Sequence, residues 1–214
     1  MLKNGDFILI EYTGYDKNGL VFDSTHGEVS KELRKREGPL LVVFGRGQLI
    51  QGLEESIKNA QINKEFEVSV PPEKGFGLRK KDLFHIIKEE DMKKHNVLPK
   101  PGLNIHLDID GRTVLGVIKS VTSGRVLVDF NHPLAGQTLR YKINIVEKIT
   151  DPEKKAEYVL KELGVKSDNT SLNSGKLKLK ISNEKNAKDF GKIKKIVEGS
   201  IKSSIPEIKE VSFE

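Results

Sequence analysis

The sequence is 214 residues long, with 36% hydrophobic residues, 32% charged residues and a formal net charge of +6. This composition is typical of a soluble globular chain with several small cores and a solvated, mixed-charge surface. The absence of cysteine excludes disulfides, thiol catalysis and thiolate metal sites. No apolar leader follows Met1 and no stretch has the length of a membrane span, so we expect a cytoplasmic protein without membrane contact.

Alternating apolar residues predict a small β-rich unit at the start of the chain. Residues 7–15 and 20–23 flank Asn18-Gly19, a pair that strongly favours a hairpin. The polar residues 24–38 are compatible with a loop or with a short surface helix. The other elements predicted here are a strand over 40–44, a helix over 52–60 and a strand over 64–70.

The character of the chain changes after Gly77. Charged residues dominate 78–102, where we expect a strand over 83–87 and a helix over 89–95. Short apolar runs separated by turn residues then predict a compact meander. Its strands are expected over 103–109, 113–121 and 126–130, with a turn at Asp110-Gly111, and one more strand follows over 139–149.

A third region begins at Asp151-Pro152, where an aspartate cap and a proline at the first helical position predict a helix that Gly164 ends. The elements expected after it are a polar loop over 167–175, a strand over 177–181, a helix over 183–200 and a strand near 208–213. In that second helix, the residues expected to point inward are Phe190, Ile193, Ile196 and Val197.

This third region forms a thin βαβ-like unit. We expect its alternating strands to expose apolar residues, such as Leu177, Leu179 and Val211. A unit of this kind needs a partner to complete its core. We therefore expect residues 151–214 to self-associate, giving a homodimer.

The segment from Phe44 to Glu55 joins an apolar strand to a short helix through Gly45 and Gly47. Glycine permits backbone angles that other residues avoid. Leu49 and Ile50 lie at the mouth of the helix without a neighbouring nucleophile or base. This segment is the corner around which the predicted strands gather.

Four motifs follow one another along residues 1–150. They are Tyr12 with Phe22-Asp23, the segment 44–54, the run Pro71-Pro72-Glu73-Lys74-Gly75-Phe76-Gly77, and the run Asp129-Phe130-Asn131-His132-Pro133-Leu134-Ala135-Gly136. Together they resemble the FKBP-type peptidyl-prolyl isomerases of the SlyD-like branch. In that branch an insert-in-flap chaperone domain interrupts the catalytic domain between the last two motifs. The region after 150 is similar to the appended domain of long archaeal members, which is linked to dimerisation.

The resemblance implies an α+β fold. It would consist of an antiparallel half-barrel sheet around a short helix, an inserted small, mostly-β domain and a small α/β C-terminal domain. The implied boundaries are 1–82 with 129–150 for the isomerase domain, 83–128 for the insert and 151–214 for the C-terminal domain. The implied function is peptidyl-prolyl cis-trans isomerisation during protein folding.

The resemblance also implies site residues. The proline pocket would be walled by Tyr12, Phe22, Phe44, Leu49, Ile50, Leu53 and Tyr141. The Ile50 N–H would hold a substrate carbonyl, Asp23 would lie at the pocket edge bonded to Tyr12, and Phe76 and Leu134 would cover the pocket. Two residues depart from the family pattern: Phe76 replaces a usual tyrosine, and Leu53 replaces a tryptophan that is often present.

An apolar pocket suits this reaction because no covalent bond need be broken. Rotation about an X–Pro bond faces a barrier of about 18–20 kcal/mol that arises from amide resonance. Excluding water from the planar, polar amide favours the twisted form. Neither a cofactor nor a metal is needed, and the five scattered histidines have no ligand spacing.

The insert is expected to hold unfolded, proline-containing clients. Its candidate client-binding residues are Leu83, Phe84, Ile86, Ile87, Val97 and Leu98. The alternative is that these residues form the core of the insert itself. A second function is a holdase-type chaperone with little isomerase turnover, which only the change at Phe76 supports. Nucleic-acid binding is disfavoured, because the basic clusters at 79–81 and 93–94 lack interleaved aromatic residues apart from Phe84.

Overall fold

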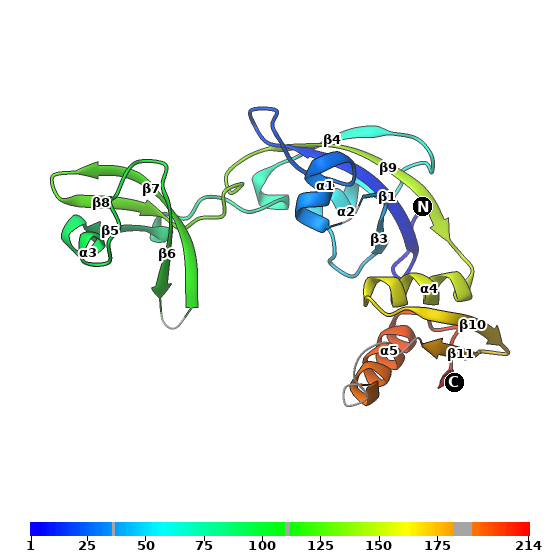
Figure 1. Cartoon of the computed structure of the whole chain (residues 1–214). Coiled ribbons are helices and arrows are strands. Elements are labelled where there is room, and N and C mark those ends of the chain that lie inside the picture. Colours follow the sequence, from blue (N-terminus) through cyan, green and yellow to red (C-terminus); the bar gives the residue numbers. More distant parts are fainter. Residues whose placement is uncertain (36, 110–111, 182–189) are drawn as a thin grey trace. The chain divides into compact units, whose positions relative to one another are not determined.

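The structure is a computed structural model that describes residues 1–35, 37–109, 112–181 and 190–214 (Figure 1). The chain divides into two compact units, one formed by Met1–Val70 with Arg140–Glu214 and the other by Pro71–Leu139. As expected, the protein is α+β with antiparallel sheets and a few helices. None of the described helices is long and apolar enough to span a membrane.

The first unit contains a five-stranded sheet in the order β2-β1-β9-β4, with β3 also paired to β1. Two short helices connect its strands, one after β2 and one after β3. The second of them, α2, packs close to β4 at Gly52. A Cβ on Gly52 would lie 2.5 Å from a Val70 methyl. The bounds are β1 (Phe7–Tyr15), β2 (Val21–Ser24), α1 (Gly27–Arg34), β3 (Leu40–Val43), α2 (Gln51–Ile57), β4 (Phe66–Val70) and β9 (Leu139–Ile149).

The hairpin predicted from Asn18-Gly19 is present, but its loop is longer than a two-residue turn. Tyr15 pairs with Val21, and the Asp16 carboxylate accepts hydrogen bonds from the N–H groups of Asn18 at 2.8 Å and Leu20 at 2.9 Å. Between the two readings of residues 24–38, the structure selects the short helix, α1.

The C-terminal region begins with the predicted capped helix. The Asp151 side chain accepts the Glu153 N–H at 2.9 Å, and Pro152 is the first residue of α4. Strands β11 and β12 are parallel and are connected through α5, which gives the expected βαβ arrangement. The bounds are α4 (Pro152–Glu162), β10 (Ser167–Asn173), β11 (Lys176–Ile181), α5 (Phe190–Ser204) and β12 (Glu210–Phe213); positions 183–189 of the expected second helix lie outside the described residues.

The loop expected over 167–175 is a strand instead. β10 pairs antiparallel with β11 through a two-residue turn at Ser174-Gly175, where φ is +49° and +78°. Positive φ at both central residues is the geometry that joins twisted strands tightly. The polar composition of β10 concealed it, because this edge strand has an exposed or half-buried side chain at every position.

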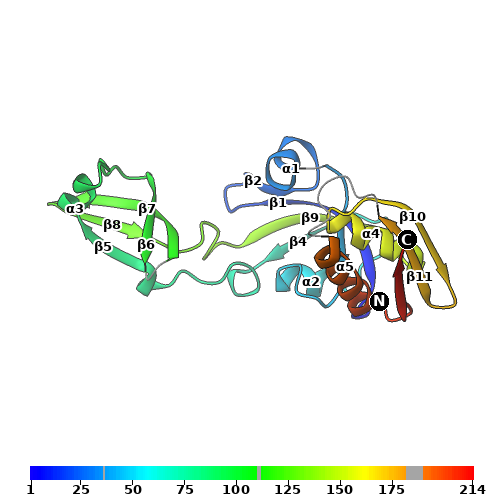
Figure 2. The ribbon, with the colours of Figure 1, turned by 60° about the horizontal axis from the view of Figure 1, so that its bottom comes forward.

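The predicted exposure of the C-terminal strands is wrong. Leu177 and Leu179 are fully buried, and Val211 is 8% exposed. They share one core with residues of the five-stranded sheet, and α4 lies between the two sheets (Figures 1 and 2). The buried members of this shared core are Phe7, Leu9, Leu41, Val43, Ile149, Ala156, Val159, Leu160, Leu177, Leu179, Val197, Ile201, Ile205, Ile208 and Val211.

β1 is therefore buried on both faces. Phe7 and Leu9 face the shared core, whereas Ile8 and Ile10, on the opposite face by strand alternation, are also fully buried. Within α5 the inward stripe is Val197, Ile201 and Ile205 at helical spacing. Ile196, which we expected to face inward, lies off that stripe and is 56% exposed.

The second unit holds a four-stranded antiparallel sheet in the order β5-β8-β7-β6. It matches the predicted meander, although the Asp110-Gly111 turn lies outside the described residues. A small core around Met92, Ile105, Ile118, Val126 and Val128 holds this unit together. The bounds are two 3-10 turns (Pro72–Lys74 and Lys81–Leu83), β5 (Phe84–Lys88), α3 (Glu89–Lys94), β6 (Asn104–Ile109), β7 (Arg112–Thr122) and β8 (Arg125–Asp129).

Candidate functional site

Tyr12 and Asp23 form a hydrogen-bonded pair where β1 runs beside β2. The Tyr12 hydroxyl donates to Asp23 Oδ2 at 2.8 Å. Burial, together with this bond to a carboxylate, raises the pKa of Tyr12 well above its ordinary value. The phenol therefore keeps its proton at neutral pH, and the pair can orient a polar group without transferring a proton.

Three aromatic rings meet beside this pair. The Phe22 ring packs edge-on against Tyr141, with centroids 5.6 Å apart, and the Tyr12 and Tyr141 centroids are 6.3 Å apart. Gly14 makes this packing fit, because a Cβ there would lie 2.8 Å from both Phe22 and Tyr141. Burial and the nearby Asp23 charge raise the pKa of Tyr141 as well. The result is an uncharged wall with one carboxylate at its edge.

The loop between β3 and α2 carries the other candidate pocket residues. Phe44 and Leu53 are buried at its two ends, whereas Leu49 and Ile50 are half-buried. Gly45 and Gly47 adopt φ of +84° and +66°, which L side chains rarely tolerate. The loop thus needs both glycines to turn from the strand into the helix.

Hydrogen bonds from the loop's own polar side chains fix its shape. The Gln48 side-chain oxygen accepts the Val43 N–H at 2.7 Å, and Glu54 accepts the Gly45 N–H at 2.7 Å. At the start of α2, the Ile50 carbonyl accepts a hydrogen bond from the Leu53 N–H at 3.0 Å. Within the described ranges the Ile50 N–H has no hydrogen-bond partner, so it is a donor left for a ligand.

Two further residues support Tyr12, and sequence reasoning assigned a role to neither. Thr25 brackets the Tyr12 backbone: its Oγ1 accepts the Tyr12 N–H at 2.9 Å, and its own N–H donates to the Tyr12 carbonyl at 2.9 Å. The Arg34 charge offsets part of the rise in the Tyr12 pKa. Its Nη2 atom is buried without a hydrogen-bond partner in the described chain. No spacing pattern in the sequence links these residues to Tyr12.

The remaining two candidates, Phe76 and Leu134, belong to the second unit. Phe76 stacks on His132, with ring centroids 4.4 Å apart and planes 5° from parallel. The Leu134 N–H donates to His132 Nδ1 at 3.2 Å. The Gly136 N–H donates to the Gly77 carbonyl at 2.8 Å. The two motif runs around Phe76 and Leu134 are thus held side by side.

Comparison with known proteins decides the family. A model for FKBP-type peptidyl-prolyl cis-trans isomerase matches residues 1–93, and one described as "FKBP26, IF domain" matches residues 85–134. A short-type peptidyl-prolyl cis-trans isomerase of Methanocaldococcus jannaschii is 34% identical over 150 residues, which cover 68% of this chain and 92% of that protein. The chain belongs to the FKBP-type peptidyl-prolyl cis-trans isomerases.

SlyD proteins are among the relatives of this isomerase. That of Treponema pallidum is 31% identical over 154 residues, covering 71% of this chain and 82% of the relative, and that of Helicobacter pylori is 28% identical over 139 residues, covering 64% and 70%. These matches support the SlyD-like assignment. The enzyme therefore interconverts the cis and trans forms of X–Pro bonds, a reaction for which an uncharged pocket without nucleophiles is suited.

The candidate client-binding residues of the isomerase divide into two groups. Ile86 and Leu98 are 66% and 63% exposed, whereas Ile87 and Val97 pack against the core of the second unit. Leu83 and Phe84 are half-buried. Ile87 and Val97 therefore fit the core reading, whereas the exposed Ile86 and Leu98 stay candidates for a client surface.

A groove of about 880 Å³ lies in the second unit between α3, the segment that follows it and β6. Three of the candidate client-binding residues, Ile87, Val97 and Leu98, line this groove. Sequence reasoning missed Leu103 and the β6 residues, because the order of strands in a sheet is not readable from alternation. The full lining is Ile87, Asp91, Met92, His95, Asn96, Val97, Leu98, Leu103, Asn104, Ile105, His106 and Leu107.

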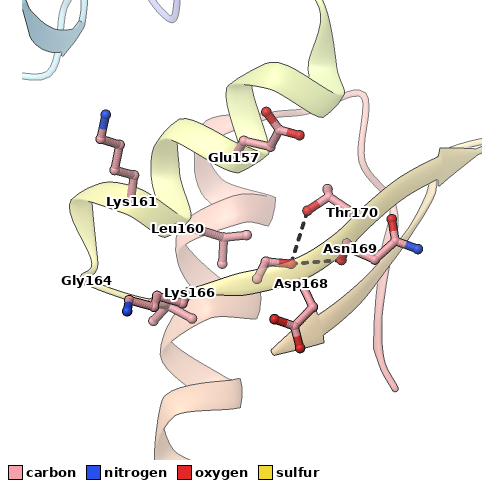
Figure 3. Close-up of a pocket in the computed structure, with 10 residues that line it drawn as sticks. Glu157, Leu160, Lys161, Gly164, Lys166, Asp168, Asn169 and Thr170 are labelled. Carbon is pink, nitrogen blue, oxygen red and sulfur yellow. Dashed lines mark hydrogen bonds between the residues drawn. The ribbon is translucent and has the colours of Figure 1, made fainter. Parts of the chain in front are cut away.

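A second hollow, of about 720 Å³, lies between α4 and β10 in the C-terminal region (Figure 3). Its charges balance, with Glu157 and Asp168 against Lys161 and Lys166. The Ser167 hydroxyl is already bonded to the Asn169 carbonyl at 2.8 Å. The charged residues of this hollow therefore give it no preference for a ligand of either charge.

Three residues of the basic clusters of the isomerase form ion pairs with neighbouring carboxylates. Arg79 forms an ion pair with Asp129, and Lys93 and Lys94 contact Glu89 at 2.7 Å and Asp91 at 2.8 Å. Such pairing leaves less charge available for a phosphate backbone. Among the described residues, no group of three or more histidines and carboxylates is arranged to hold a metal ion.

Proposed function

We propose that the proline pocket of this isomerase is formed by the aromatic corner at Tyr12 and by the loop after β3. The carrying observation is the buried Tyr12–Asp23 pair within packed aromatic rings. Asp23 lies at the edge of this corner, and no described residue accepts a hydrogen bond from the Ile50 N–H. The proposed pocket residues are Tyr12, Phe22, Asp23, Phe44, Leu49, Ile50, Leu53 and Tyr141, and for Phe76 and Leu134 only the family resemblance suggests a role at this site.

The mechanism that this arrangement supports is amide twisting in a desolvated site. The rings exclude water from the X–Pro amide, and the Ile50 N–H donates a hydrogen bond to the adjacent substrate carbonyl. Only contacts that strengthen as the amide twists accelerate the reaction. Tyr12 stays neutral because of its raised pKa, so no proton transfer enters the cycle.

An isomerase assay on a short proline peptide tests this pocket. Asp23→Ala and Phe44→Ala are each expected to lower kcat/KM about tenfold or more, equivalent to ~1.4 kcal/mol of transition-state stabilisation. Asp168→Ala serves as a matched control, because it removes an exposed carboxylate from the C-terminal hollow. A loss with Asp168→Ala, or wild-type activity with Phe44→Ala, contradicts the proposal.

We further propose that the second unit is a chaperone module that captures unfolded clients in the groove beside β6. Two exposed apolar residues, Leu98 and Leu103, border this groove and are 63% and 40% exposed. Its volume of about 880 Å³ falls within the range of ligand pockets. The groove can therefore take apolar side chains of an extended polypeptide.

The edge position of β6 supports a specific mode of capture. Among the described strands of the second unit, β6 pairs only with β7. An edge strand directs alternate backbone N–H and C=O groups away from its partner. Asn104, Ile105, His106 and Leu107 of this strand all line the groove. A client can thus bind by strand addition, with main-chain bonds giving affinity and the apolar floor holding alternate side chains.

Comparing two substrates tests client capture. The double variant Leu98→Ser/Leu103→Ser is expected to keep wild-type activity on a short proline peptide but to lose about tenfold in proline-limited refolding of an unfolded protein. Capture raises the effective concentration of prolines near the catalytic pocket, and this variant removes it. Ile86→Ser is the control, since Ile86 is about as exposed as Leu98 but is not among the residues that line the groove.

The results separate the proposal from its alternatives. Equal losses in the groove variant and in Ile86→Ser mean that the groove is not the client site. Unchanged refolding in the groove variant removes client capture altogether. A wild-type protein that suppresses aggregation without accelerating proline-limited refolding favours the holdase reading.

A further inference from the structure

The loop that carries Ile50 is fastened to the C-terminal region by one arginine. Arg46, at the exposed tip of the loop, donates from Nη2 to the backbone carbonyl of Ser203. Gly45 and Gly47 on either side of Arg46 both adopt positive φ. Gln48 and Glu54 hold the loop from within through hydrogen bonds to Val43 and Gly45, and the Arg46 contact adds a hold from outside the loop at its tip.

Ser203 is a favourable acceptor for a cation. It lies in the last turn of α5 (Phe190–Ser204), where carbonyl groups lack partners within the helix. The aligned peptide dipoles also place partial negative charge at this end. The helix's own basic residue there, Lys202, is paired with Glu198 at 2.6 Å. Arg46 thus caps α5 from outside the C-terminal region.

The helix that Arg46 reaches is a rigid anchor. Val197, Ile201 and Ile205 of α5 are fully buried in the core that also contains Leu41 and Val43 of β3. β3 leads directly into the loop. The chain therefore closes a ring: β3 enters the loop, Arg46 joins the loop to α5, and α5 packs back onto β3.

We propose that Arg46 is a positioning residue for proline isomerisation. By fastening the loop to α5, it holds the Ile50 N–H in a fixed place, and the C-terminal region contributes to catalysis through this contact. This inference rests on the role proposed for Ile50. Arg46 itself touches no substrate and acts by restricting the movement of the loop.

Two variants and two measurements test the inference. Arg46→Ala is expected to lower kcat/KM on a short proline peptide about threefold, the size expected for one exposed charge–dipole contact. Arg46→Lys restores most of this loss, because an ammonium group also donates to a carbonyl. Arg125→Ala, which removes an exposed arginine from the second unit, leaves kcat/KM unchanged.

Amide hydrogen exchange separates positioning from stability. The Gly45 N–H is bonded to Glu54 and therefore reports opening of the loop. In Arg46→Ala we expect Gly45 to exchange several-fold faster while Val197 and Ile201 keep their wild-type protection. Faster exchange at Val197 in step with Gly45 overturns the proposal, since the contact then stabilises only the C-terminal region.

Two other results also overturn it. One is a wild-type kcat/KM in Arg46→Ala, whether or not the loop loosens. The other is an Arg46→Lys variant as impaired as Arg46→Ala, because the tether needs only a donor to the carbonyl. The assignment of the pocket itself is judged separately by Phe44→Ala, which leaves the Arg46 contact in place.

Discussion

Gly14 is the residue on which the aromatic corner depends. A Cβ at this position would lie 2.8 Å from the Phe22 and Tyr141 rings, closer than carbon atoms approach in folded proteins. Gly14→Ala is expected to displace both rings and to lower kcat/KM about tenfold, with a loss of roughly 1–3 kcal/mol in unfolding free energy from overpacking. Peptide isomerisation and thermal unfolding measure the two effects.

Gly199→Ala is the matched control for Gly14. A Cβ on Gly199 meets nothing within 4 Å, and the residue lies inside α5. Replacing glycine by alanine in a helix interior stabilises by about 0.5–1 kcal/mol. A Gly14→Ala variant that is as active and stable as Gly199→Ala contradicts the packing described at the corner.

The raised pKa values of Tyr12 and Tyr141 predict how stability depends on alkaline pH. Both are raised chiefly by burial, with Asp23 adding to the shift. A group whose folded pKa is raised contributes stability that is complete below its unfolded pKa, about 10 for tyrosine. That stability is lost as pH rises through the folded value. Denaturant unfolding from pH 8 to 12 should show falling stability above pH ~10, less steeply in Tyr141→Phe.

At the level of residues, the Tyr12–Asp23 pair was predicted, whereas the residues that pack around it were not. The Tyr12–Asp23 bond was implied by family resemblance, and the structure contains it. Gly14, Thr25 and Arg34 were not assigned, because their contacts depend on side-chain packing between strands and helix α1. Alternation gives the face of a residue but not its neighbour across the sheet.

Among the elements, two segments of the second unit are joined by a polar clamp. Asn131 accepts the Lys80 N–H through Oδ1 at 2.8 Å and donates to the Lys80 carbonyl at 3.0 Å. Asp129 accepts the Asn131 N–H at 3.0 Å and pairs with Arg79. Asn131 thereby imitates a strand partner for the segment that precedes β5.

Asp129 makes this clamp sensitive to acid. Burial alone would raise its pKa, but the hydrogen bonds from Asn131 and the Arg79 charge outweigh burial and lower it. A carboxylate with a lowered folded pKa contributes stability that is complete above its unfolded pKa, about 3.9, and is lost as pH falls through the folded value. Thermal unfolding between pH 2 and 7 should show this loss, and Asp129→Asn should be less stable at pH 7 with a flatter acid limb. An unchanged acid limb in Asp129→Asn contradicts the clamp.

The elements show which patterns carry structural information. The Asp151 cap, the alternation of β9 and β11 and the meander were predicted because each is written in local spacing. β10 was missed, because its polar residues show no alternation and only the pairing with β11 makes it a strand. The groove proposed for clients was predicted only in part, because its lining depends on the position of β6 at the edge of the sheet.

For the whole molecule, the C-terminal region completes the isomerase core. A chain that ends at residue 150 would expose Phe7, Leu9, Leu41 and Val43, which are now buried in the shared core. Exposing a large apolar side chain costs about 1.5–3 kcal/mol, and total stability is typically about 5–15 kcal/mol. The 1–150 truncation is therefore expected to lose most of its stability. A cooperative melt within about 5 °C of the full chain contradicts the shared core.

Self-association through residues 151–214 stays a prediction, but its original reason no longer holds. We expected exposed strands that need a second copy, and Leu177 and Leu179 are instead covered by the same chain. Light scattering on the full-length protein, which keeps this core intact, measures the oligomeric state. A monomer would fit the intramolecular core and end the dimer hypothesis.

Titration of isotope-labelled full-length protein with a short proline peptide tests the central claim most directly. Amide chemical shifts show where the peptide binds, and exchange spectroscopy on the peptide shows whether its X–Pro bond is isomerised. We predict the largest shifts at Tyr12, Ile50 and Tyr141, with accelerated cis-trans exchange of the peptide. Shifts confined to the hollow between α4 and β10, or exchange that accelerates without shifts at these three residues, would contradict the proposed pocket.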